Sequence, residues 1–316
     1  MSDTETLNTL VAQYHALKSE MGKVIVGQEK AVDSLLISIF TGGHCLLVGV
    51  PGLAKTLMVN ILAKALGLTF NRIQFTPDLM PSDITGSEIL DENRRFQFIK
   101  GPVFANIILA DEINRTPPKT QAALLEAMQE HSVTVSGKSY RLDDPFFVLA
   151  TQNPIEQEGT YPLPEAQLDR FMFNIRMDYP SFAEEVDIVK GTTVDTHPEV
   201  SKVLTAEDIL GHQRVIRRMP VPDNVCEFAV SLAASTRPGK ADSLATKYLS
   251  WGAGPRASQY LVMGAKTHAA LHGKYSPDME DVKAVATEVL RHRIVRNYYA
   301  EAENITVESL VEELLK

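Results

Sequence analysis

Cysteine, tryptophan and long apolar runs are scarce in this chain. Its 316 residues include 2 cysteines and 1 tryptophan. Cys45 and Cys226 lie far apart in the sequence and belong to no C-x-x-C pair, so neither a disulfide framework nor a zinc site is indicated. We expect both to be buried, reduced thiols. The histidines show no zinc-ligand spacing, and His292, which stands between two arginines, is expected at the surface.

Apolar stretches are also too short for a membrane span, which requires roughly 18 consecutive apolar residues. The first residues, Met1 to Thr6, are acidic and polar, unlike a signal peptide. The sequence therefore predicts a cytoplasmic protein without membrane insertion.

An excess of basic residues is absent as well. The chain has 31 Lys plus Arg against 40 Asp plus Glu, a net charge of −9, and a pI near 5.4. A nucleic-acid motor needs a basic face for phosphates, so this balance disfavours nucleic acid as a partner. Two local arginine groups are expected to be solvated helix faces. These groups are Arg214, Arg217 and Arg218 on one predicted helix and Arg291, Arg293 and Arg296 on another.

The most informative motif runs from Gly49 to Thr56, between an apolar run at 44–48 and a helix-like segment at 57–66. It follows the P-loop pattern G-x-x-x-x-G-K-[ST] except at Ala54, where the pattern has its second glycine. In such a loop, backbone amides and the helix N-terminus surround phosphate, the lysine reaches the β and γ phosphates, and the hydroxyl binds Mg²⁺. The predicted nucleotide-binding residues here are Gly49, Val50, Pro51, Gly52, Leu53, Ala54, Lys55, Thr56 and Leu57.

Two further apolar runs end in polar residues. Residues 107–110 precede Asp111 and Glu112, and residues 146–150 lead to Asn153. The carboxyl ends of parallel strands meet at one edge of a sheet, so these side chains should converge on the P-loop. Asp111 would hold Mg²⁺ with Thr56, Glu112 would polarise the attacking water, and Asn153 could orient that water.

Two arginines could complete the charge of such a site. Arg170 lies in the segment 165–171, and Arg256 follows Gly254-Pro255 at the predicted start of a helix. Guanidinium groups are always charged and fork onto phosphate oxygens, so they can stabilise developing γ-phosphate charge. If one comes from a neighbouring subunit, the active site is an interface.

These motifs resemble those of the AAA+ ATPases and, within them, the MoxR family. The loop Gly-Val-Pro-Gly-Leu-Ala-Lys-Thr is similar to the MoxR form of Walker A, alanine included. The segments 74–86, 101–104, 110–115 and 150–154 also match. The resemblance implies ATP and Mg²⁺ as cofactors and identifies Asn153 with sensor 1, Arg170 with the arginine finger and Arg256 with sensor 2. It places Val26, Gly27 and Gln28 near adenine, and Arg115 is a second candidate for the charge between subunits.

Two domains are predicted. Residues 1–178 alternate strand-like and helix-like runs, as in a three-layer α/β P-loop domain, and residues 179–316 read as an all-helical lid. Tyr179-Pro180-Ser181 is the expected hinge, and Arg256 the lid's contact to phosphate. Capping boxes are predicted at Ser181 and Thr205, and Pro277 is expected just inside a helix.

Two segments inside the first domain are predicted to be hairpins, at residues 86–100 and 133–142. Both resemble insertions of the AAA+ branch that includes MoxR, magnesium chelatase and replicative helicases. In a ring they would face the central opening and touch the remodelled molecule. The alternative is that they only pack against neighbouring subunits.

The leading hypothesis is an ATP-driven chaperone that remodels or matures protein partners. The resemblance implies a homo-oligomeric ring, of six subunits, and partners with a von Willebrand factor A domain. The alternatives are a nucleotide-dependent switch or scaffold with slow hydrolysis, and a magnesium chelatase-like or nucleic-acid motor.

Overall fold

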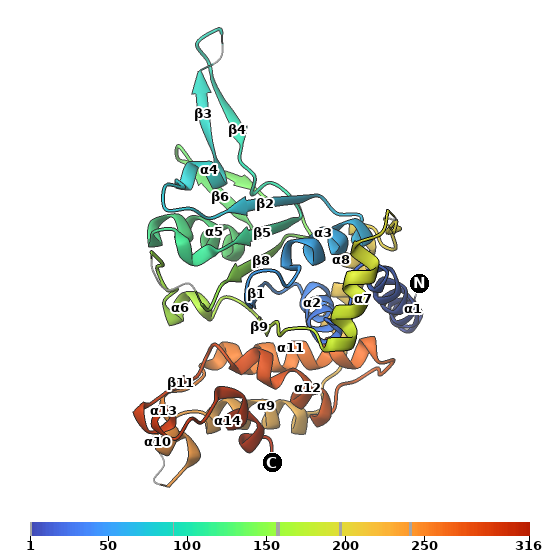
Figure 1. The fold of residues 1–316 in the computed structure, drawn as a ribbon, viewed down its shortest axis with the longest axis vertical. Coiled ribbons are helices and arrows are strands. Elements are labelled where there is room, and N and C mark those ends of the chain that lie inside the picture. Colours follow the sequence, from blue (N-terminus) through green and yellow to red (C-terminus); the bar gives the residue numbers. More distant parts are fainter. Residues whose placement is uncertain (1, 91, 156–158, 196–197, 240–241) are drawn as a thin grey trace.

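The computed structural model describes residues 2–90, 92–155, 159–195, 198–239 and 242–316. Its centre is a five-stranded parallel sheet in the order β2-β5-β8-β1-β9 (Figure 1). Because all five strands run parallel, their carboxyl ends share one edge of the sheet and their amino ends the other. The strands are β1 (Cys45–Val48), β2 (Phe70–Gln74), β5 (Ile107–Asp111), β8 (Phe147–Gln152) and β9 (Phe173–Arg176).

Helices cover both faces of this sheet, because successive strand residues point to opposite sides. Cys45 and Leu47 enter a core shared with α1 (Asp3–Gly22), α2 (Glu29–Thr41) and α3 (Lys55–Leu66). Leu46 and Ala110 enter a second core against α5 (Pro118–Glu130). The expected three-layer α/β domain is confirmed.

The lid lies below the edge strand β9 in Figure 1. Its core is continuous with that of α1 and α2, through buried residues such as Leu261 and Val285. Besides helices it contains a short antiparallel pair, so it is largely but not entirely helical. The elements are α9 (Asp223–Ser235), α10 (Leu244–Tyr248), β10 (Leu249–Trp251), α11 (Pro255–Leu271), α12 (Met279–Leu290), β11 (Val295–Arg296), α13 (Tyr298–Ala302) and α14 (Val307–Leu314).

Two helices connect the sheet to the lid. Both predicted capping boxes are present, Ser181 at the start of α7 (Phe182–Thr192) and Thr205 at the start of α8 (Ala206–Arg218). α8 packs on the α/β side, where the Gln213 amide donates to the Ile39 carbonyl at 2.7 Å. The domain boundary near residue 178 stays a prediction, and this packing favours a boundary after α8.

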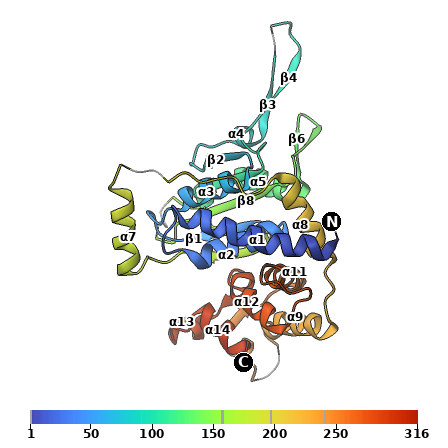
Figure 2. The same cartoon turned by 90° about the vertical axis from the view of Figure 1, so that its right-hand side faces the viewer.

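Two antiparallel hairpins rise from the opposite side of the domain (Figures 1 and 2). The first joins β3 (Gly86–Leu90) to β4 (Phe96–Lys100), after the short helix α4 (Pro81–Thr85), and Asp91 in its predicted turn lies outside the described residues. The second joins β6 (Ser132–Val135) to β7 (Lys138–Arg141). Phe98 stacks on Tyr140 with ring centroids 4.0 Å apart, and Lys138 pairs with Glu88 at 3.1 Å. The second hairpin therefore braces the base of the first.

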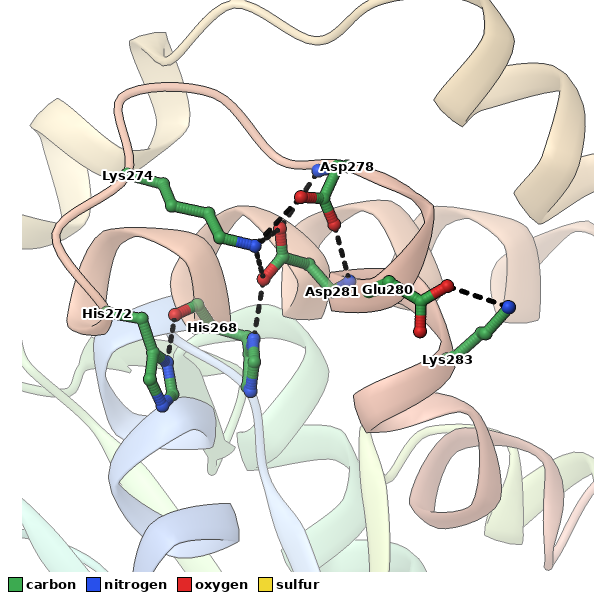
Figure 3. Close-up of polar contacts among 7 residues, drawn as sticks. All are labelled: His268, His272, Lys274, Asp278, Glu280, Asp281 and Lys283. Carbon is green, nitrogen blue, oxygen red and sulfur yellow. Dashed lines mark hydrogen bonds and ion pairs between the residues drawn. The ribbon is translucent and has the colours of Figure 1, made fainter.

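The turn between α11 and α12 is held by a charged cluster (Figure 3). Asp278, not Pro277, caps α12, so Pro277 precedes the cap and its expected place inside the helix is wrong. The Asp278 carboxylate accepts a hydrogen bond from the Asp281 backbone amide at 3.1 Å. Lys274 forms ion pairs with the side-chain carboxylates of both Asp278 and Asp281. Lys274 and this amide lower the pKa of Asp278 to about 2.

Cys45 is buried as expected, whereas Cys226 is partly exposed, so the expectation of burial is wrong for the second cysteine. In the part of the chain that the structure describes, every helix falls short of the length or apolarity needed to cross a bilayer.

Candidate functional site

The loop between β1 and α3 forms a cradle of backbone amides. Gly52 has φ 87° and Ala54 has φ 56°, both in the left-handed region. Ala54 thus adopts the backbone conformation for which the motif uses glycine, at a cost of roughly 1 kcal/mol for its Cβ. Among the described residues no side chain caps α3, so its first amides point toward the loop. Lys55 Nζ donates across the loop to the Gly49 carbonyl at 2.7 Å.

Asp111 is held at the end of β5 by two neighbouring strands. It is buried, and one carboxylate oxygen accepts the Thr151 hydroxyl at 2.6 Å. The other accepts Arg72 Nη2 at 2.6 Å and Nε at 3.0 Å. The carboxylate therefore reaches the site already oriented by β2 and β8.

Glu112 is held in a similar way. Its Oε2 accepts Gln74 Nε2 at 3.0 Å and Arg115 Nη1 at 3.1 Å, and its amide donates to Thr151 at 2.9 Å. Sequence reasoning missed the roles of Gln74, Thr151 and Arg72. Thr151 occurs where the apolar strand β8 turns polar, the same signal that identified Asp111. β2 is not an apolar run, so nothing local marks Gln74 or Arg72.

Asn153 and the N-terminal segment lie at this same carboxyl edge. Gly49 donates its amide to the Gln152 carbonyl at 3.3 Å, which joins the end of β8 to the loop just before Asn153. Asn153 is buried, and its side-chain oxygen accepts the Ile155 amide at 3.2 Å. Val26, Gly27 and Gln28 line a cavity of about 560 Å³ with Lys18, Ile25 and Glu184.

The residues at this edge fit a magnesium nucleotide. Lys55 and the open amides of α3 suit phosphate, and the Thr56 hydroxyl and Asp111 carboxylate are the oxygen ligands that Mg²⁺ prefers. Within the described ranges, no group of three His, Cys, Asp or Glu side chains is arranged to hold a metal by itself. A magnesium ion here would therefore take further ligands from phosphate and water.

Arg170 lies at the opposite edge of the sheet. It follows α6 (Glu165–Leu168) and precedes β9, whose first residue, Phe173, pairs with Cys45 at the start of β1. The P-loop follows the other end of β1. Met172 donates its amide to the His44 carbonyl at 2.7 Å, which fixes the loop at this amino edge. Arg170 and Lys55 of one chain therefore lie at opposite edges of the sheet, Arg170 at the amino edge and Lys55 at the carboxyl edge.

Arg256 lies beside the loop that carries Arg170. It is in the first turn of α11, as expected, and its Nη1 is 3.1 Å from the Asp169 carboxylate. Within one chain it therefore stands with Arg170 and not with the P-loop. Arg115, by contrast, is paired with Glu112 of its own chain at the carboxyl edge.

Two residues expected at the surface are buried at the amino edge. Arg293 is 5% exposed and His292 is 8% exposed, so the expectation of solvated positions is wrong for both. They follow α12, which ends at Leu290, and are packed between the lid and the loop that carries Arg170. Burial lowers the pKa of His292 well below its ordinary value.

Comparisons with known proteins agree with this arrangement. Residues 44–173 match the model of the ATPase family associated with various cellular activities (AAA), and residues 241–314 match the AAA lid domain. Over 315 residues the chain is 42% identical to Chaperone MoxR1 of Mycobacterium tuberculosis, covering 97% of this chain and 83% of that protein. The chain belongs to the MoxR family of AAA ATPases.

Other relatives extend over similar lengths of this MoxR-family chain. It is 44% identical over 298 residues to the uncharacterized protein YeaC of Bacillus subtilis, covering 93% of this chain and 91% of YeaC. A crystal structure from Cytophaga hutchinsonii, of a chain assigned as an ATPase, superposes with a TM-score of 0.91 at 44% identity. That match covers 98% of this chain and 96% of the other, so the two chains share the arrangement of both domains.

Proposed function

We propose that this protein hydrolyses ATP to ADP and phosphate in a ring of identical subunits, and that the cycle drives chaperone-like remodelling of protein partners. One observation carries the proposal. Lys55, Asp111 and Glu112 lie at the carboxyl edge of the sheet, whereas Arg170 and Arg256 lie at the amino edge. A site that contains both sets needs two copies of the chain in a head-to-tail contact, and such contacts form a ring when the rotation between copies closes.

In such a site each residue has a role suited to its chemistry. Lys55 and the amides of α3 bind phosphate, and Thr56 and Asp111 hold Mg²⁺. The ion, when bound, neutralises charge on the phosphate oxygens. Glu112 takes a proton from the attacking water, and Asn153 orients that water. Arg170 and Arg256 of the adjacent copy stabilise charge on the γ-phosphate.

The first hairpin supports a role on protein partners. It projects from the body (Figure 2) and exposes apolar side chains on both of its faces, with Phe96 71% exposed and Ile89 48% exposed. Apolar groups in that position suit contact with another polypeptide. The family resemblance makes a von Willebrand factor A domain the expected feature of such a partner.

Two measurements test the proposal together. ATP hydrolysis per subunit should rise with protein concentration as rings assemble. Mixing Lys55→Ala with Arg170→Ala should restore turnover that neither variant shows alone, because some neighbours then combine an intact P-loop with an intact Arg170. Turnover by the wild type without any recovery on mixing would contradict the shared site.

A second candidate is a nucleotide-dependent switch or scaffold with slow hydrolysis. It is favoured by the hydrogen bonds that Gln74 and Arg115 donate to the Glu112 carboxylate. These bonds must weaken before the carboxylate can accept a proton, which would slow hydrolysis. Glu112→Gln separates the two functions. A remodeller should be trapped on a co-expressed partner by this variant, whereas a scaffold should hold the partner equally well through wild-type turnover.

A magnesium chelatase-like or nucleic-acid motor remains the third candidate. Strong stimulation of turnover by single-stranded or duplex DNA would favour the nucleic-acid motor over the protein remodeller. Metal insertion into a tetrapyrrole in the presence of chelatase partners would favour the chelatase.

A further inference from the structure

Arg293 is the centre of the contacts between the lid and the loop that carries Arg170. Its Nε donates to an Asp169 carboxylate oxygen at 2.8 Å. Its two terminal nitrogens donate to the backbone carbonyls of Asp169 at 3.0 Å, Phe171 at 2.6 Å and Met172 at 3.1 Å. One buried guanidinium thus satisfies most of the carbonyls on either side of Arg170.

Neighbouring lid residues hold the same loop. The Arg293 guanidinium lies 5.1 Å from the centre of the Tyr260 ring, and the Tyr260 hydroxyl is 3.4 Å from the Arg170 carbonyl. His292 Nε2 is 3.0 Å from the Phe171 carbonyl. The backbone of the Arg170 loop is therefore fixed by the lid and not by the sheet alone.

The Asp169 carboxylate links Arg293 to Arg256. One carboxylate oxygen binds Arg293, and the other binds Arg256 at 3.1 Å. Asp169 and Arg293 also line a cavity of about 650 Å³ with Trp251 and Glu165, so the outer side of the pair is open. Because two guanidinium groups share one carboxylate, the three side chains together carry a net positive charge.

We propose that Arg293 is a positioning residue: it fixes the loop 169–172 and, through Asp169, Arg256, so that Arg170 and Arg256 are presented as one unit to the nucleotide of the adjacent subunit. The inference rests on the proposed function, because it concerns the active site shared between two copies. It also means that the lid and both arginines of a chain move together.

The test is to measure ATP affinity and turnover for Arg293→Met and Asp169→Asn. Both variants should keep nucleotide affinity, because their own P-loop is intact. Turnover should fall by about 100-fold, the loss typical of a misplaced catalytic group. Arg293→Lys keeps the charge but cannot donate all of the guanidinium hydrogen bonds, so its turnover should lie between those of Arg293→Met and the wild type. Arg296→Met is the control, since Arg296 Nη1 donates to the Ile305 carbonyl, and it should keep wild-type turnover.

Mixing with Lys55→Ala separates positioning from general damage. Subunits with Lys55→Ala supply intact arginines, so Arg293→Met should regain turnover in mixed rings, as Arg170→Ala does. Near-normal turnover by both Arg293→Met and Asp169→Asn would overturn the inference. So would recovery of Arg170→Ala on mixing without recovery of the Arg293 or Asp169 variant. If Arg293→Met does not fold, the Asp169→Asn variant decides. Absence of wild-type turnover would instead contradict the proposed function.

Discussion

The two edges of the central sheet are built in different ways. At the carboxyl edge, the P-loop and the acids follow directly from the strands that carry them: Gly49 and Asn153 stand just beyond a strand end, and Asp111 is the last residue of β5. At the amino edge, the loop that carries Arg170 is held by residues more than a hundred positions later in the chain, above all Arg293. The first edge is encoded locally, and the second exists only after the lid has packed.

This difference bears on the proposed function. Under that proposal, the carboxyl edge binds nucleotide within a single chain, whereas the amino edge acts on the nucleotide of another subunit. Variants at the two edges should therefore separate ATP binding from ATP turnover.

The largest expected effect is at the amino edge. Arg170→Ala should lower turnover by about 10³- to 10⁵-fold, the range for an arginine supplied by a neighbour. ATP affinity should persist, because Lys55 and the P-loop are unchanged. Steady-state kinetics and nucleotide titration measure the two effects. Arg214→Ala, at an exposed position, is the control. Near-normal turnover in Arg170→Ala would exclude its role as the finger.

The next effect is at the carboxyl edge. Glu112→Gln removes the proposed base and should lower turnover by about 10²- to 10⁴-fold. The amide keeps the shape of the side chain, so ATP should still bind. Single-turnover hydrolysis measures the chemical step directly. Normal single-turnover rates in this variant would end the assignment of Glu112 as base.

A smaller effect concerns pH and the support of the amino edge. His44 Nδ1 accepts the Val148 amide at 3.0 Å, so the proton is on Nε2, which lies 3.0 Å from the Met128 carbonyl. Burial lowers the pKa of His44 from 6.5 to about 4. The native state then binds fewer protons than the unfolded state, so stability is lost as pH falls from 6.5 toward 4. The loss from this group should be about 2 kcal/mol at pH 5.

Urea unfolding at pH 7.5 and pH 5 measures this loss. His44→Gln does not titrate in this range, so its stability should depend less steeply on pH than that of the wild type. His15→Gln, at an exposed position, is the control and should keep the wild-type dependence. An unchanged dependence in His44→Gln would contradict the assignment.

The smallest effect is in the P-loop. Ala54 has φ 56°. Replacing it with glycine relieves strain but adds freedom to the unfolded chain, so Ala54→Gly should change stability by less than about 0.5 kcal/mol. Ala54→Val places a branched side chain at positive φ and should destabilise the protein by about 1–2 kcal/mol. Thermal unfolding of the two variants side by side gives the comparison, and equal stability would argue against a strained Ala54.

Sequence reasoning succeeded where the signal was local. Apolar runs predicted β1, β5 and β8, and the capping boxes at Ser181 and Thr205 were correct. It failed where packing decides. His292 and Arg293 resemble surface residues because their neighbours are charged, yet both are buried beneath the Arg170 loop. Pro277 was placed inside a helix because proline suits the first turn, but Asp278 caps the helix one residue later.

The sequence by itself determined which residues form the carboxyl edge, because a strand and the residues that follow it mark the phosphate-binding loop and the acids. Tertiary structure alone decided where Arg170 and Arg256 lie relative to Lys55. Their position depends on which end of β1 pairs with the start of β9. It also depends on the hydrogen bonds by which the Arg293 guanidinium joins the lid to the loop that carries Arg170. Such contacts join segments distant in the chain, so no local pattern records them.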